Sequence, residues 1–109
     1  MYISVTGLKP KGLIGWIRFW ILTIPAAKDA QKAEGILRCM FKSRNGFQHT
    51  LTVWKSKKYM LGYLRSSAHT KAMKNFSKIG VGKTYGYEAG AIPSWEDTLL
   101  KYDKNGRTH

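Results

Sequence analysis

The dipeptide Asn45-Gly46 limits the fold of this chain more than any other sequence feature. It separates two runs rich in β-forming residues, at positions 36–43 and 47–54. Asn-Gly between such runs is the strongest short-range signal for a two-residue β-hairpin. With these two residues in the loop, the predicted cross-strand pairs are Lys42 with His49, Met40 with Leu51, and Arg38 with Val53.

This register also assigns the hairpin side chains to two faces, because successive residues of a strand point to opposite sides. One face carries Arg38, Met40, Lys42, His49, Leu51 and Val53. The other face carries Leu37, Cys39, Phe41, Thr50, Thr52 and Trp54. Each face mixes apolar and polar residues, so we expect both sides of the sheet to be covered in part.

Residues 13–24 form the longest apolar run and predict a helix. Apolar side chains occur nearly all round it, so it must be covered on more than one side, by a partner subunit, a tail or a lipid surface. Pro25 should end or kink it. The run is too short for a membrane span, which needs about 20 residues, and it contains Arg18.

The remaining elements complete a ferredoxin-like pattern. They are a strand at 2–8, a helix capped by Ser56 and interrupted at Ser66-Ser67, a strand at 80–90, and a short C-terminal helix with Ser94 and Asp97 in capping positions. The order β-α-β-β-α-β is the split βαβ arrangement of the α+β class, with an antiparallel sheet. We assign residues 1–102 to a single domain and 103–109 to a polar, frayed tail.

The charge balance is strongly basic, with 19 Lys and Arg against 6 Asp and Glu, a net charge of +13. Such a field attracts phosphate polymers and anionic membranes. The cations are spread from Lys9 to Arg107 without a block of five or six, which favours a solvated surface over a nucleic-acid site. The lone Cys39 and the few acids predict no disulfide and no metal site, and they favour a cytoplasmic protein.

Residues 49–54 (HTLTVW) and 66–73 (SSAHTKAM) resemble motifs of the dimeric α+β barrel superfamily. The resemblance is to the branch related to spheroidene monooxygenase and the antibiotic-biosynthesis monooxygenases. It implies a homodimer whose sheets pack face to face, with a pocket in each subunit between its sheet and helices. It further implies a monooxygenase-like activity on an aromatic or polyene compound, either without a cofactor or with haem.

His69 and His49 are the candidate catalytic residues. His69 could act as a general base or as an axial haem ligand, or it could brace the helix break by hydrogen-bonding backbone. His49, with Lys42 and Arg38 as neighbours, should stay neutral easily and suits proton abstraction from a phenol or enol. It could equally be an interface histidine with one satisfied hydrogen bond.

The residues expected to bind substrate are Arg38, Arg65, Trp54, Met73 and Trp20. Either arginine could clamp a carboxylate or phosphate, whereas Arg65 could also be solvated. Both tryptophans are interpreted first as core residues, with a flat aromatic pocket as the alternative.

Two further functions stay open beside the enzyme. One is a non-catalytic ligand-binding or regulatory dimer that uses the same pocket. The other, which is less favoured, is a nucleic-acid-binding protein that uses the basic surface, although the sheet lacks the aromatic RNP1 pattern.

Overall fold

The computed structural model describes residues 1–65 and 80–108. Their strands are β1 (Tyr2–Pro10), β2 (Ile36–Arg44), β3 (Phe47–Trp54), β4 (Gly80–Glu88) and β5 (Arg107–Thr108). Their helices are α1 (Gly12–Lys32), α2 (Lys57–Leu64) and α5 (Trp95–Asn105). Three predicted features, the break at Ser66-Ser67 and the residues His69 and Met73, lie outside the described residues.

The sheet order is β2-β3-β1-β4-β5, and each neighbouring pair is antiparallel. The first four strands follow the ferredoxin-like order, with β1 paired to both β3 and β4. The predicted α+β, ferredoxin-like fold class is therefore confirmed.

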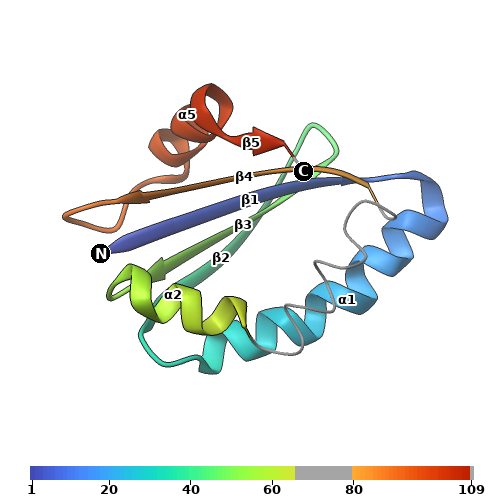
Figure 1. Cartoon of the computed structure of the whole chain (residues 1–109). Coiled ribbons are helices and arrows are strands. Elements are labelled where there is room, and N and C mark those ends of the chain that lie inside the picture. The colour runs from blue at the N-terminus through green and yellow to red at the C-terminus, as the bar shows by residue number, and fades with distance from the viewer. Residues whose placement is uncertain (66–79, 109) are drawn as a thin grey trace.

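The described helices lie on both sides of this sheet, with α1 and α2 on one face and α5 on the other (Figure 1). Alternation along β1 explains the two layers, because Ile3 and Val5 point toward α5 while Ser4 and Thr6 point toward α1 and α2. The core on the α5 side consists of Ile3, Val5, Leu51, Val53, Leu99 and Tyr102, all of them buried. The second sheet face, for which a partner subunit was expected, is thus covered at its centre by the chain's own C-terminal helix.

The hairpin register agrees with the prediction at all three pairs, and Asn45 and Gly46 have φ angles of 53° and 81°. Both values are positive, as a type I′ turn requires. Leu37 is a correction, because a register shift lies between Ile36 and Arg38. This irregularity places Leu37 against the α5-side core instead of on the face of Cys39.

Helix α1 does not end at Pro25, which was one of the two expected effects of that residue. It continues through Pro25 to Lys32, because Pro25 is exposed and the carbonyl that it leaves unpaired can bond to water. The residues buried beneath the helix are Gly15, Phe19, Ala26 and Ala30. The isoleucines of the apolar run point outward instead. Among the described helices, none is long and apolar enough to cross a bilayer.

The C-terminal helix begins as predicted, since the Ser94 hydroxyl accepts a hydrogen bond from the Asp97 amide at 3.1 Å. The helix extends past residue 102, into the segment that was assigned to the tail. Tyr102 is 3% exposed within the core, the helix continues to Asn105, and β5 then pairs with β4. Contact with the sheet therefore orders residues that the polar sequence placed in a tail.

Candidate functional site

A cavity of about 400 Å³ lies between the sheet and the helices α1 and α2. Its floor is a row of hydroxyl side chains from the two central strands, Ser4, Thr6, Thr50 and Thr52. These residues share one face because Ser4 pairs with Thr52 and Thr6 pairs with Thr50. Its walls include Phe19, Leu22, Ala26, Met60 and Leu64 from the helices. An apolar cleft with a few placed polar groups is typical of small-molecule sites.

The polar groups among the described lining residues of this cavity are neutral. Burial raises the pKa of the Cys39 thiol and raises the pKa of Tyr63 to about 12. The Tyr63 hydroxyl donates to the Ala26 carbonyl at 2.8 Å, and the Thr52 hydroxyl donates to the Ser4 carbonyl at 3.3 Å. No Asp, Glu, Lys, Arg or His occurs among the described lining residues. This part of the wall suits a neutral ligand that exchanges hydrogen bonds with hydroxyls.

His49 lies across the sheet from this cavity, beneath α5. It is 1% exposed, its Nδ1 lies 3.3 Å from the Thr6 carbonyl oxygen, and its ring is perpendicular to the Tyr102 ring, with the two ring centroids 5.2 Å apart. A carbonyl only accepts, so Nδ1 carries the proton. Nε2 is buried and has no hydrogen-bond partner among the described residues. Burial, followed by the charge of Arg44, lowers the His49 pKa, which favours the neutral ring.

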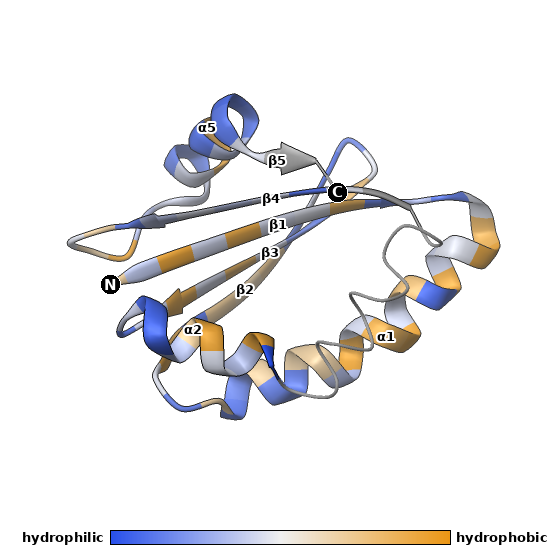
Figure 2. Cartoon of the chain, viewed as in Figure 1, coloured by the Kyte–Doolittle hydropathy of each residue, from blue (hydrophilic) through white to orange (hydrophobic). Residues whose placement is uncertain are grey.

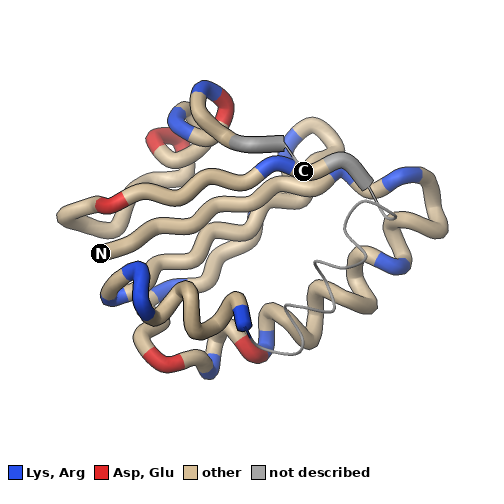
Figure 3. Tube along the Cα trace, in the orientation of Figure 1, with Lys and Arg blue, Asp and Glu red and all other residues tan. Residues whose placement is uncertain are grey.

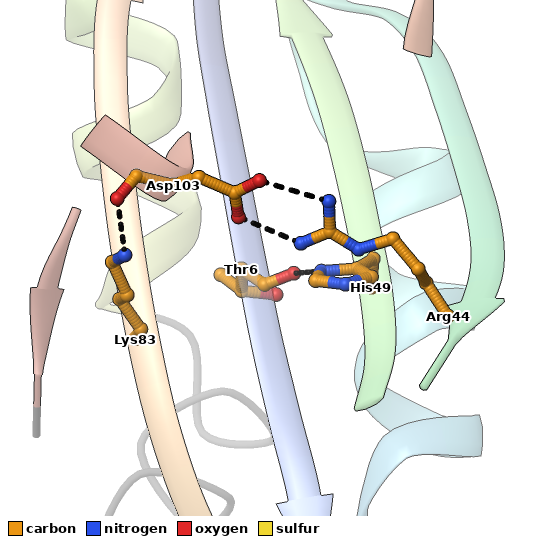
Figure 4. A network of polar contacts seen from close by, with 5 residues as sticks. All are labelled: Thr6, Arg44, His49, Lys83 and Asp103. Carbon is orange, nitrogen blue, oxygen red and sulfur yellow. Dashed lines mark hydrogen bonds and ion pairs between the residues drawn. The ribbon is translucent and has the colours of Figure 1, made fainter. Parts of the chain in front are cut away.

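A polar network closes this side of the molecule over His49 (Figure 4). Arg44, at the end of β2, makes two hydrogen bonds to the Asp103 carboxylate of α5, at 2.7 and 3.0 Å. Lys83 of β4 donates to the Asp103 backbone carbonyl at 3.0 Å. The network joins β2, through Arg44, and β4, through Lys83, to α5. It therefore holds α5 in place above the buried His49.

Four of the residues expected to bind substrate, Arg38, Arg65, Trp54 and Trp20, are not among the described lining residues, and the fifth, Met73, lies outside the described part of the chain. Trp54 is fully buried and packs against Tyr63 with ring centroids 5.4 Å apart, while Trp20 packs beside Leu8 and Phe19. Arg38 is exposed on the sheet face that carries His49, and Arg65 is exposed at the end of α2.

The hydroxyl row was absent from the sequence-based site, although the sequence contains a signal for it. Thr50 and Thr52 alternate in HTLTVW, and so do Ser4 and Thr6 in the first strand. Period-two spacing places each pair on one face. Predicting in addition that the first strand pairs with the second hairpin strand, with Ser4 opposite Thr52, would have brought the four hydroxyls together.

The chain is thus a ferredoxin-like protein with a cavity between its sheet and its helices. Its fold is similar to that of many solved structures, three of which illustrate the likeness. A proposed antibiotic biosynthesis monooxygenase from Deinococcus radiodurans has 19% sequence identity and a TM-score of 0.74, over 86% of this chain and 97% of that chain. One from Nitrosomonas europaea has 11% identity and a TM-score of 0.73, over 84% and 100%.

The third is SnoaB, a cofactor-independent oxygenase from Streptomyces nogalater, with 11% identity and a TM-score of 0.67 over 85% of this chain and 97% of that chain. No family model and no curated protein matches the chain. These likenesses show that the chain shares the fold of these three structures.

The described lining does not fit haem, the cofactor implied by the resemblance to spheroidene monooxygenase. A haem iron takes an axial ligand such as a histidine or a thiolate. The described wall offers no histidine, and burial raises the pKa of its Cys39 thiol. The haem ligand that the sequence suggested, His69, lies outside the described residues. The described wall also offers no Arg or Lys for the propionates. No step is therefore assigned to haem.

Proposed function

We propose that this chain binds a small, largely apolar aromatic or polyene compound in the cavity between its sheet and helices α1 and α2. The observation that carries the proposal is the row of neutral hydroxyls beneath an apolar wall. Binding of aromatic rings or conjugated chains removes apolar surface of both the wall and the ligand from water, which favours binding. The hydroxyls would orient one carbonyl or phenol group of the ligand. A charged substrate would lose its hydration without an ionic partner among the described lining residues.

The proposed reaction is monooxygenase-like and needs no cofactor, supported by the fold that the chain shares with a cofactor-independent oxygenase. A methylene flanked by aromatic rings is acidic enough to lose a proton to a base. Its reaction with O₂ can give a carbonyl and water, and the substrate then supplies all the electrons. His69 is the proposed base, because the described wall lacks one. The alternative is a non-catalytic binding protein that uses the same cavity, a function that requires no base.

The experiment fills the cavity and compares binding. Ala27 is half-buried and lines the cavity, whereas its neighbour Lys28 is exposed on the same helix. Native mass spectrometry should detect a co-purified or added polycyclic phenol on the parent protein and on Lys28→Phe, but not on Ala27→Phe. Equal occupancy in both variants would place the ligand elsewhere.

Oxygen uptake with the bound compound then separates the two functions. We expect uptake by the parent protein and its loss in His69→Ala with ligand binding retained. Binding without any uptake would leave the non-catalytic function.

A homodimer, as the resemblance implies, is part of the proposal. Because α5 covers the centre of the second sheet face, the subunits would meet beside it, where Leu37 and Met40 are half-buried. The mass of one chain is 12.4 kDa, and light scattering should give twice this value. A single species with the mass of one chain would contradict the dimer.

A cytoplasmic location and the less favoured nucleic-acid binding stay predictions. Specific nucleic-acid binding should survive moderate salt, which abolishes purely charge-driven binding.

A further inference from the structure

Helix α1 presents an apolar stripe to solvent on the side away from the sheet. The stripe consists of Leu13, Ile14, Ile17, Ile21 and Ile24, with Trp16 beside it. Leu13 is 75% exposed, Ile14 70% and Ile21 65%, values that are unusual for such large side chains at adjacent positions of one helix. Figure 2 shows hydrophobic segments along the length of this helix. Contiguous apolar surface of this kind marks an interaction site more often than scattered single residues do.

Helical spacing makes the stripe continuous. Leu13, Ile17, Ile21 and Ile24 recur at intervals of three or four residues, which places them on one side of the helix. Phe19 and Ala26, in contrast, are buried toward the sheet. At a rise of about 1.5 Å per residue, the stripe is roughly 18 Å long. The sheet therefore takes one side of α1, and the stripe is a second, separate apolar side.

Cations surround this stripe. Lys11 precedes the helix, Arg18 lies beside the stripe, and Lys28 and Lys32 follow it, all of them exposed. Asp29 is the one acidic residue of the helix. Figure 3 shows Lys and Arg near both ends of α1 and between them. The whole chain carries a net charge of +13. An occupant of the stripe must therefore combine an apolar surface with negative charge.

We propose that α1 docks onto an anionic lipid surface with its axis parallel to the membrane. The stripe would enter the boundary between headgroups and acyl chains, as interfacial helices do to a depth of about 5–10 Å. Lys28 and Lys32 would reach the lipid phosphates, and Trp16 would lie at headgroup level. The sheet stays above the bilayer and holds the helix in place.

Two other occupants fit the chemistry less well. A second copy that used the same stripe would bring the flanking cations of both copies together, with only Asp29 to offset them. A nucleic acid would match the cations and leave the isoleucines in water. A lipid surface satisfies both the apolar and the charged parts of the helix.

Vesicle co-sedimentation tests the proposal at about 0.15 M ionic strength. The parent protein should bind phosphatidylcholine vesicles that contain phosphatidylserine, and bind pure phosphatidylcholine far less. Ile21→Glu should weaken binding about tenfold or more, because a carboxylate is costly to desolvate. Leu100→Glu is the matched control, since Leu100 is 63% exposed on α5 and should leave binding unchanged. Lys28→Gln should weaken binding about fivefold, and Lys101→Gln should not.

Three outcomes would overturn the proposal. One is the absence of parent binding to anionic vesicles, and another is equal binding by Ile21→Glu and the parent, which would indicate adsorption by charge alone. The third is a dimer that dissociates in Ile21→Glu by light scattering, which would assign the stripe to a second copy. Circular dichroism checks that both Glu variants remain folded. A blue shift of Trp16 fluorescence on vesicles, lost in Trp16→Phe, adds a readout that does not depend on sedimentation.

Discussion

Arg44 and Asp103 form a bidentate ion pair that joins the end of β2 to α5, with Nη2–Oδ1 at 2.7 Å and Nη1–Oδ2 at 3.0 Å. The hydrogen bond from Arg44 is the main reason that the Asp103 pKa is lowered. Their side chains are 32% and 52% exposed, so solvent screens the pair and its contribution is small.

Asp103→Asn should lower the free energy of unfolding by about 0.5–1 kcal/mol at neutral pH. The stabilisation is present above the ordinary aspartate pKa of about 3.9 and is lost as the pH falls through the lowered folded value. Urea titrations of both proteins at several pH values measure the difference. A gap that persists in strong acid would mean that Asp103 stabilises the protein by other contacts. Glu34→Gln, a surface change elsewhere, should show no such gap.

His49 should make the protein less stable in weak acid. Its folded pKa is lowered, chiefly by burial, so below the ordinary histidine pKa of about 6.5 the unfolded chain binds the proton first. The free energy of unfolding should therefore fall as the pH drops from about 6.5 toward the folded pKa. His49→Gln should flatten this slope even if it lowers stability overall. An unchanged slope would assign the acid sensitivity to another group.

Gly7 and Gly62 should respond in opposite ways to alanine. A Cβ at Gly7 would meet the Tyr102 hydroxyl and lie 2.7 Å from Nδ1 of His49, inside a packed core. Overpacking there should cost about 1–3 kcal/mol. Gly62 is an exposed residue of α2, and no atom lies within 4 Å of such a Cβ. Alanine should stabilise that helix by about 0.5–1 kcal/mol. Thermal unfolding should give a lower melting temperature for Gly7→Ala and a higher one for Gly62→Ala than for the parent protein. A Gly7→Ala variant as stable as the parent would mean that α5 can shift.

Tyr63 should be among the last tyrosines to ionise. Its pKa is raised to about 12 by burial, so its stabilisation is complete below the ordinary value of about 10 and is lost as the pH rises toward 12. Ultraviolet titration of the parent should show a high-pH component that Tyr63→Phe removes. The variant also loses the bond to the Ala26 carbonyl, at a cost of about 0.5–1.5 kcal/mol. A component unchanged in Tyr63→Phe would assign the high pKa to another tyrosine.

The hairpin could be predicted residue by residue as far as Arg38, because Asn45-Gly46 fixes a turn of known length and the turn fixes the pairs next to it. The register shift between Ile36 and Arg38 was not predictable from the turn. The orientation of α1 could not be predicted, because apolar residues occur on both of its sides and periodicity cannot choose between them. The buried side combines the small residues Gly15, Ala26 and Ala30, which allow close approach to the sheet, with Phe19, which packs against Leu8. The bulky isoleucines were left outside.

The candidate site was less predictable than the fold. The two strands that supply its hydroxyls are separated by the whole of α1, so only the pairing of β1 with β3 shows that they meet. The ion pair above His49 joins residues 59 positions apart, and no local pattern connects Arg44 to Asp103. Residues 103–105 were assigned to a tail because they are polar, although the spacing of Leu99 and Tyr102 matches one face of a helix that continues through them.

The position of β1 at the centre of the sheet, beneath α5, has a consequence for synthesis on the ribosome. β1 needs β3 and β4 as partners and α5 as its cover, and all three follow it in the chain. Ile3 and Val5 therefore emerge long before anything can bury them. Such non-local pairing slows folding and leaves apolar strands exposed to aggregation. We expect nascent chains stalled before residue 95 to engage chaperones, and released full-length chains to escape them.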